Sequence, residues 1–275
     1  MRLTVVADNR TCRDDLTIQH GLCFWIEQKD HQVLFDTGSD ASWLQNAERL
    51  GVDPLSADML FISHGHWDHG GGLPALVERG WQGVLVAHPG AWQRKRAVKS
   101  GEAERNTGLT WSSTEIEKLG VQVEAVSEPG PLFDGAWTTG PIPGEHPTPA
   151  ALGLQAYIDG AWQPEDFLDE QTLVLETAKG LVVVTGCCHR GVLNTLDAVK
   201  ASTGRHDIYA LIGGLHQKDE PRENCLQLAR ELRNAGIQKV WANHCTGLHP
   251  FAQMREILGD DLVWAEAGTI IQIED

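Results

Sequence analysis

The 275-residue sequence has no apolar run of the roughly eighteen residues that a membrane-spanning helix needs. Basic residues are also scarce, because 22 Lys and Arg stand against 38 Asp and Glu and leave a formal net charge of −16. A phosphate backbone needs clustered cations, so this balance argues against a nucleic-acid partner. We therefore expect neither a membrane nor a nucleic acid as a partner.

Cysteine is sparse as well, and its six positions lack the spacing of a disulfide framework. A reduced, cytoplasmic protein is the corresponding expectation. The first eight residues turn polar too quickly for a signal peptide and predict a strand instead. The length suits one large domain, residues 1–275, or two tightly joined halves with a substantial core.

Donor side chains are concentrated in one short stretch. His64, His66, Asp68 and His69 follow an apolar run at 59–62 and precede three glycines. Alternation along an extended segment puts His64, His66 and Asp68 on one side, and a turn returns His69 to them. Such nitrogen and carboxylate donors suit Zn²⁺ best, with Fe or Mn as alternatives. The stretch predicts a site for one or two divalent metal ions.

Apolar periodicity and turn residues predict a mixed α/β chain. Helices are expected at 42–50, 73–79, 192–202, 223–235 and 251–258. Strands are expected at 3–7, 22–27, 32–36, 58–63, 83–88, 121–125, 136–139, 172–176, 181–185, 208–212, 239–243 and 269–273.

Three pairs of segments recur in the same order along the chain. They suggest two similar halves that face each other, which is a four-layer αββα sandwich. Strand ends should then converge on one edge and bring Asp36, His64, His88, Cys187, His216 and His244 together. The pairs are 34–38 with 183–187, 58–64 with 207–216, and 80–88 with 236–244.

Two segments differ from the rest. Residues 91–108 hold the one basic cluster, which is either a solvated helix face or loop, or a lid whose cations meet an anionic substrate. Residues 140–149 are rich in proline and glycine, so they predict an ordered loop or a flexible flap.

The stretch from His64 to His69 resembles the His-x-His-x-Asp-His signature of the metallo-β-lactamase superfamily. An apolar strand that ends in Asp-Thr-Gly at 36–38 is a second mark of that superfamily. Segments at 8–9, 21–27, 185–191 and 244–247 resemble a narrower group, the dihydropterin ribofuranosylaminobenzene phosphate synthase-like branch. The resemblance covers nearly the whole chain and implies the αββα fold.

The resemblance also implies a ligand set. His64, His66 and His189 would hold one metal, and Asp68, His69 and His244 a second. His146 competes with His189, because a histidine motif of other branches falls there. Most members have a bridging Asp where this chain has Cys187, which is either a thiolate ligand or a small buried residue.

Several further residues are expected near the site. Asp36 is expected to orient the metal region through hydrogen bonds rather than to bind metal. On resemblance, Asp8, Asn9 and His20 reach the rim of a substrate pocket. For His216 and His88, predicted at strand ends that face the cleft, a structural role and substrate contact weigh equally.

These residues predict metal-assisted hydrolysis of an ester, phosphoester or similar small anionic substrate. Asp68 would bind metal and orient the nucleophile, while His216 or water would protonate the leaving group. The narrower resemblance implies a condensation with diphosphate release instead. A di-iron redox protein is a further alternative, although such relatives use a glutamate where Trp67 stands. A metal-stabilised protein without catalysis is the last alternative.

Overall fold

The computed structural model describes residues 1–99, 101–151 and 153–274, whose strands form two seven-stranded sheets and one four-stranded sheet. The first large sheet contains, in spatial order, β18 (Ile270–Gln272), β1 (Arg2–Ala7), β2 (Cys23–Gln28), β3 (His31–Phe35), β4 (Met59–Phe61), β5 (Val84–Ala87) and β8 (Gln122–Ala125). The second contains β17 (Leu262–Trp264), β16 (Lys239–Asn243), β15 (Ile208–Gly214), β14 (Gly180–Thr185), β13 (Leu173–Thr177), β10 (Ala136–Thr138) and β9 (Gly130–Phe133).

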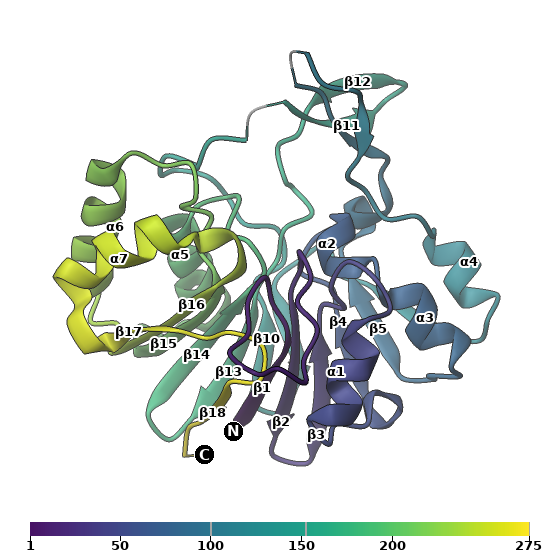
Figure 1. Ribbon diagram of the computed structural model, residues 1–275, viewed down its shortest axis with the longest axis horizontal. Helices are drawn as coiled ribbons and strands as arrows, with labels where there is room; N and C mark the ends of the chain where they lie inside the picture. Colours follow the sequence, from purple (N-terminus) through teal and green to yellow (C-terminus); the bar gives the residue numbers. More distant parts are fainter. Residues whose placement is uncertain (100, 152, 275) are drawn as a thin grey trace.

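Helices cover the outer faces of both large sheets, as Figure 1 shows. Short 3-10 turns occupy Pro54–Ser56, Pro89–Trp92, His244–Thr246 and Gly259–Asp261. The α-helices are α1 (Trp43–Arg49), α2 (Trp67–Gly70), α3 (Leu73–Glu78), α4 (Ser113–Glu117), α5 (Val192–Thr203), α6 (Arg222–Asn234) and α7 (Leu248–Leu258). None of the described helices is long and apolar enough to cross a membrane.

Alternating side chains build the layers of the fold. Phe24 of β2 and Val184 of β14 meet in the core between the two large sheets. Their neighbours point the other way: Trp25 packs with α1 and α3, and Val183 packs with α5, α6 and α7. Apolar residues on both faces explain why these strands are nearly continuous hydrophobic runs. The predicted four-layer αββα sandwich is confirmed.

Strand direction decides where polar side chains gather. In the first sheet β3, β4 and β5 run parallel, and in the second β14, β15 and β16 do so. Carboxyl ends of parallel strands meet at one edge of a sheet, where open α/β sheets bind their ligands. Asp36 follows β3, Ser63 follows β4, Cys187 follows β14 and His244 follows β16 at this edge.

The small sheet is formed partly by the basic segment. It contains β12 (Ala161–Pro164), β11 (Leu154–Ile158), β6 (Lys95–Ala97) and β7 (Arg105–Asn106), and it projects beyond the edge at which α2 lies (Figure 1). Within 91–108 the structure has strands where the sequence predicted a helix face or loop, so that prediction is wrong for 95–97 and 105–106. Ser100 lies outside the described residues. A lid role for 91–108 stays a prediction.

The Pro-rich segment matches its prediction in local structure. All of residues 140–149 are described, and they form neither helix nor strand. Asn194 of α5 holds the segment, because its side-chain oxygen accepts hydrogen bonds from the backbone of Glu145 and His146 at 2.9 and 2.8 Å. Movement of the segment as a flap stays a prediction.

We predict that Phe35→Ala lowers the free energy of unfolding by about 3–5 kcal/mol, because it leaves a cavity between the sheets. Phe35 is fully buried, and its ring lies 5.8 Å from that of Phe24 and 5.5 Å from that of Phe61. Denaturant unfolding measures the change. Ile270→Ala, at a half-exposed side chain, serves as the control and should cost about 0.5 kcal/mol or less. Equal losses in the two variants would contradict this packing.

Candidate metal centre

The histidine motif changes conformation in its middle. His64 follows β4, His66 is still extended, and Asp68 and His69 lie within α2. The prediction of an extended segment through Asp68 is therefore wrong, and the helical turn brings Asp68 and His69 to the cleft. Glycine is required at position 65, between His64 and His66, because a Cβ there would lie 2.0 Å from the backbone oxygen of Ala91.

The structure gathers the first predicted ligand set. One potential ligand atom from each of His64, His66 and His189 lies within 4.8 Å of the others, and all three side chains are buried. His146 lies elsewhere, on the surface, where its Nε2 is 2.9 Å from Asp197. His189, rather than His146, is thus the histidine that the fold brings beside His64 and His66.

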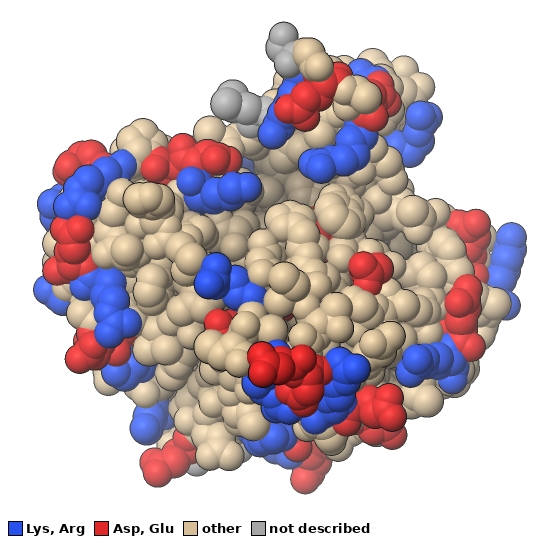
Figure 2. Space-filling view, in the orientation of Figure 1, with Lys and Arg blue, Asp and Glu red and all other residues tan. Residues whose placement is uncertain are grey.

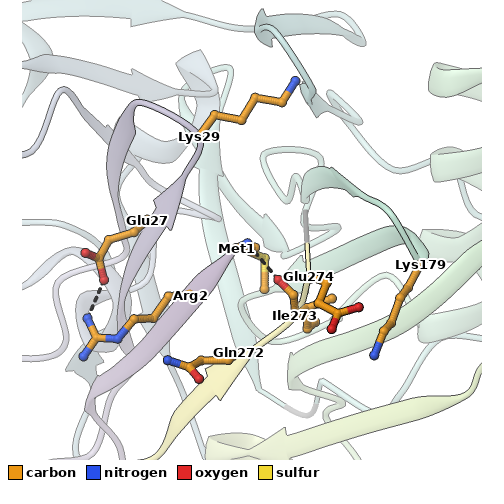
Figure 3. A pocket seen from close by; sticks show the side chains of 8 residues that line it. All are labelled: Met1, Arg2, Glu27, Lys29, Lys179, Gln272, Ile273 and Glu274. Atoms are coloured by element: carbon orange, nitrogen blue, oxygen red, sulfur yellow. Dashed lines mark hydrogen bonds and ion pairs between the residues drawn. The ribbon is translucent and has the colours of Figure 1, made fainter.

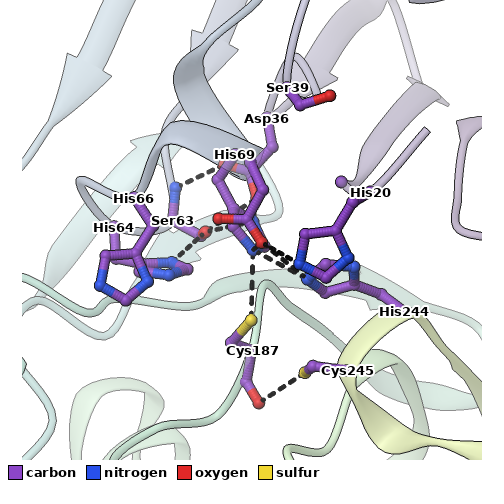
Figure 4. Close-up of polar contacts among 12 residues, drawn as sticks. His20, Asp36, Ser39, Ser63, His64, His66, His69, Cys187, His244 and Cys245 are labelled. Atoms are coloured by element: carbon purple, nitrogen blue, oxygen red, sulfur yellow. Dashed lines mark hydrogen bonds and ion pairs between the residues drawn. The ribbon is translucent and has the colours of Figure 1, made fainter. Parts of the chain in front are cut away.

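The second predicted set is gathered in the same way. Asp68, His69 and His244 also offer ligand atoms within 4.8 Å of one another. The Nε2 atoms of His69 and His244 are 3.2 Å apart (Figure 4). Oδ2 of Asp68 lies 3.5 Å from His244 Nε2. The two halves of the sequence therefore meet at this point.

Cys187 lies between the two sets. Its Sγ is 3.2 Å from His69 Nε2 and belongs to a group with His64 and His69 whose ligand atoms lie within 4.8 Å (Figure 4). Burial, together with Cys245, raises the pKa of the Cys187 thiol well above its usual value. A cation would displace that proton, because thiolate is the form that binds metal. The position suits the alternative in which Cys187 takes the place of the bridging Asp.

Asp36 fixes the orientation of the motif. Its carboxylate accepts hydrogen bonds from the backbone N of Ser63 and from Ser63 Oγ, both at 2.8 Å, and from His69 Nδ1 at 2.6 Å. The predicted hydrogen-bonding role of Asp36 is confirmed. Because a carboxylate only accepts, His69 carries a proton on Nδ1 and turns Nε2 toward the site. Although burial opposes it, the charges of Asp36 and Asp68 raise the pKa of His69 to about 9, so a cation would displace the second proton from Nε2.

Asn9 fixes the ring of His244 by the same logic. Asn9 Oδ1 accepts from the backbone N of Gly21 at 3.2 Å, which sets the amide orientation, and lies 2.9 Å from His244 Nδ1. His244 therefore also directs the lone pair of Nε2 inward. His20 completes this wall, since its Nδ1 lies 3.1 Å from Asn9 Nδ2 and its Nε2 lies 3.3 Å from Asp68 Oδ2.

Buried nitrogens without partners show that the residues fit a cation. His64 Nε2 and both ring nitrogens of His189 are buried and have no hydrogen-bond partner among the residues that the structure describes. Burial, reinforced by neighbouring histidines, lowers the pKa of both rings well below the usual value, so they are neutral. A neutral imidazole offers a lone pair, and an unpaired one is costly to bury. A divalent metal would satisfy Nε2 of His64 and one ring nitrogen of His189.

Backbone strain is concentrated here. Residues other than glycine rarely adopt a positive φ, and such strain gathers at functional sites. At the strand ends of the site, the structure has positive φ at Asp36 (57°), Cys188 (61°), His216 (47°) and His244 (48°).

A cleft of about 650 Å³ opens onto both ligand sets. Exposed Arg10, Arg105 and Lys218 stand on its wall, and none of them has an ion-pair partner within the described part of the chain. On the face shown in Figure 2, the surface is hollowed beneath the projecting small sheet, and acidic side chains lie mostly around the periphery. The other predicted or candidate residues on the wall are Asn9, His20, His66, Asp68, Cys187, His189, His216 and His244.

His216 and His88 differ in position. His216 lies on the cleft wall, and its ring centroid is 4.2 Å from that of His189. His88 is half-buried in a separate pocket beside Lys95 and Asp169, where its Nδ1 accepts from the backbone N of Gly90 at 3.0 Å. The prediction that His88 faces the cleft is therefore wrong.

The sequence reasoning missed a group of acidic side chains under the site. Glu170 accepts backbone hydrogen bonds from His189 and Arg190 at 2.8 and 2.7 Å, and its burial raises its pKa to about 7. Glu165 contacts the ring of His66, and Asp169 accepts a hydrogen bond from the backbone N of Gly65. The only signal was the density of carboxylates at 165–170, in a stretch without a predicted element.

A cavity of about 610 Å³ lies at the opposite edge of the sheets, beside both ends of the chain (Figure 3). There the Met1 amine donates to the Ile273 carbonyl at 2.8 Å, and Arg2 pairs with Glu27. None of its described lining residues is a histidine or cysteine. The metal-binding donors thus belong to the other edge.

Residues 16–157 match the family model described as the metallo-beta-lactamase superfamily. With this match, and with the αββα sandwich, the chain belongs to the metallo-β-lactamase superfamily. Its donor clusters at the strand ends are suited to binding metal ions.

One curated relative and two solved structures are similar to this chain over most of their length. The chain is 31% identical over 267 residues to the 7,8-dihydropterin-6-methyl-4-(β-D-ribofuranosyl)-aminobenzene-5′-phosphate synthase of Methanocaldococcus jannaschii, covering 92% of this chain and 90% of that protein. The resemblance to the synthase-like branch is thus confirmed. The crystal structure of Tm1679, described as a metal-dependent hydrolase of the β-lactamase superfamily, superposes with a TM-score of 0.87 at 26% identity over all of both chains. Zn²⁺-bound PqqB from Methylobacterium extorquens has a TM-score of 0.60 at 12% identity, covers 99% of this chain and 100% of its own, and shows the fold alone.

We predict that His189→Ala weakens zinc binding by at least about tenfold, the loss that even removing a hydrogen-bond partner of a ligand produces. His146→Ala is the matched control, because His146 pairs with Asp197 on the surface, and it should leave zinc binding unchanged. Metal analysis and competition with a chelator measure both. Loss of metal in the His146 variant alone would reverse the assignment.

Proposed function

We propose that the protein is a metal-dependent hydrolase acting on an ester, phosphoester or similar small anionic substrate. The observation that carries the proposal is the pair of donor sets, one of His64, His66 and His189 and one of Asp68, His69 and His244, on the wall of one cleft. One or two divalent ions, most simply Zn²⁺, with Fe or Mn as alternatives, would occupy the two sets.

A divalent cation held there would act as a Lewis acid, lowering the pKa of bound water to about 7 and polarising the oxygen under attack. Asp68 would hold and orient the nucleophile from beside His20 and His244. His216, on the cleft wall beside His189, would hold a proton at a ring nitrogen for the leaving group. Asn9 and His20 would contact the substrate at the rim.

The cleft wall supports an anionic substrate. Arg10, Arg105 and Lys218 put cations around the opening of a protein with a net charge of −16. This negative net charge supports our proposal that neither a nucleic acid nor a membrane is a partner. Its six free cysteines fit the reducing cytoplasm that we propose as its location.

The second candidate is a condensation like that named for the Methanocaldococcus relative, with release of diphosphate. Identity of 31% across 92% of this chain favours it. The side chains of Arg10, Arg105 and Lys218 would then hold phosphate groups of the two reactants. Both candidates use the same donor sets, so only the reaction products separate them.

We predict that the zinc-loaded protein hydrolyses at least one of a panel of phosphodiesters, phosphomonoesters and lactones, and that chelation lowers the rate to background. Restoring zinc should restore the rate. A parallel assay supplies a pterin diphosphate with an aminobenzene ribofuranosyl phosphate and measures released diphosphate. Diphosphate release without hydrolysis would favour the second candidate. Iron absorbance with oxygen consumption would favour a redox protein instead.

We predict that replacing both Arg105 and Lys218 by alanine weakens the binding of inorganic diphosphate, an anionic probe. Exposed charges contribute about 0.2–1 kcal/mol each, so the double variant should bind up to about 25-fold more weakly, and less so at high salt. Calorimetry at two salt concentrations measures the change. Lys118→Ala, at the exposed end of α4 outside the cleft, is the control. Equal affinity in all three proteins would remove these cations from the proposal.

A further inference from the structure

Lys95 of β6 is a charged side chain in the interior, with a relative exposure of 1%. Its Nζ lies 2.7 Å from Glu165 Oε1 and 2.7 Å from Asp169 Oδ2. Burial alone would lower the pKa of Lys95, but Asp169 and Glu165 raise it above its usual value, so the amine keeps its charge. Buried charges persist when they are paired in this way.

Both carboxylates also contact the histidine motif. The two oxygens of Glu165 lie 3.2 and 3.1 Å from His66 Nε2, and Asp169 Oδ2 accepts from the backbone N of Gly65 at 2.7 Å. Because a carboxylate only accepts, His66 carries its proton on Nε2. Nδ1 is then the nitrogen that His66 can offer beside His64 and His189.

The small sheet supplies these groups. Lys95 belongs to β6, and Glu165 directly follows β12. Two backbone contacts add to the connection: His66 bridges to Gly108, and the Trp67 N donates to the Thr107 carbonyl at 3.0 Å. The sheet that projects over the cleft is thus tied to the motif by one buried charge network and by neighbouring backbone.

We propose that Lys95, Glu165 and Asp169 form a buried network that positions His66 for metal binding. The network carries one positive and two negative charges, so it favours a proton on the outer nitrogen of His66 and a lone pair on the inner one. A carboxylate behind a ligating histidine fixes its tautomer and raises its basicity. Lys95 is thus a positioning residue, because it holds Glu165 and Asp169 in place without touching the site. The inference rests on the proposed metal site.

Glu165→Met should weaken zinc affinity by about 10–100-fold, as the loss of such a partner does. Glu165→Gln keeps an oxygen that can accept from His66, so it should lose less. Arg96→Met is the control: Arg96 is the next residue on β6, and it bonds Gln155 and Glu104 instead. Its zinc affinity should equal that of the wild type. Competition with a chelator measures each affinity.

Lys95 itself is tested by a charge-balanced pair, because removing the amine alone can prevent folding. Lys95→Met with Asp169→Asn removes one positive and one negative charge and leaves Glu165 beside His66. Zinc affinity should fall by about tenfold. Wild-type affinity in this folded double variant would remove Lys95 from the proposal.

Nitrogen-15 NMR of the metal-free protein gives a readout that a purely structural role would not move. His66 should carry its proton on Nε2 in the wild type and should populate both tautomers in Glu165→Met. A lower melting temperature with unchanged tautomer and unchanged zinc affinity would overturn the inference. If the wild type takes up no zinc, the proposed function fails, and the tautomer measurement still decides the role of Glu165.

Discussion

The structure of the site depends on one constraint, which is that buried imidazole nitrogens need partners. His64 and His69 are fully buried, and His66, His189 and His244 nearly so. Protein groups bond one nitrogen of His66, His69 and His244 and so turn the other nitrogen of each ring toward the site. Lone pairs that converge without a cation would be destabilising. The set of donors thus lowers the stability of the fold, and a bound divalent ion would offset that loss.

Sequence pattern predicted the sandwich because its strands are buried on both faces and are therefore apolar. The strand expected at 239–243 coincides with β16, and the expected ends of β3, β4 and β14 differ by at most two residues. His64, His66, Asp68 and His69 were identifiable by spacing alone. His189 and His244 needed the resemblance, because each is an isolated histidine at a strand end. The division of the domain into two similar halves stays a prediction.

The small sheet could not be predicted from pattern. Its strands β6 and β7 are three and two residues long and include Lys95, Arg96, Arg105 and Asn106, which carry no apolar alternation. Lys95 is buried only because carboxylates some seventy residues later in the chain reach it. The left-handed backbone at His216 and His244 is equally invisible in sequence, because neither position is a glycine.

The small sheet touches function at two places. Arg105 and Leu154 of the sheet line the cleft, together with Thr107 directly after β7. Glu165 and the backbone of Gly108, which lie next to the sheet, contact the histidine motif. Binding free energies at two sites that share an element are reciprocal. If a molecule in the cleft steadies this sheet and so tightens cation binding, the cation must tighten binding of that molecule by the same factor. Cation affinity measured with and without candidate molecules would then report on cleft occupancy before any reaction is known.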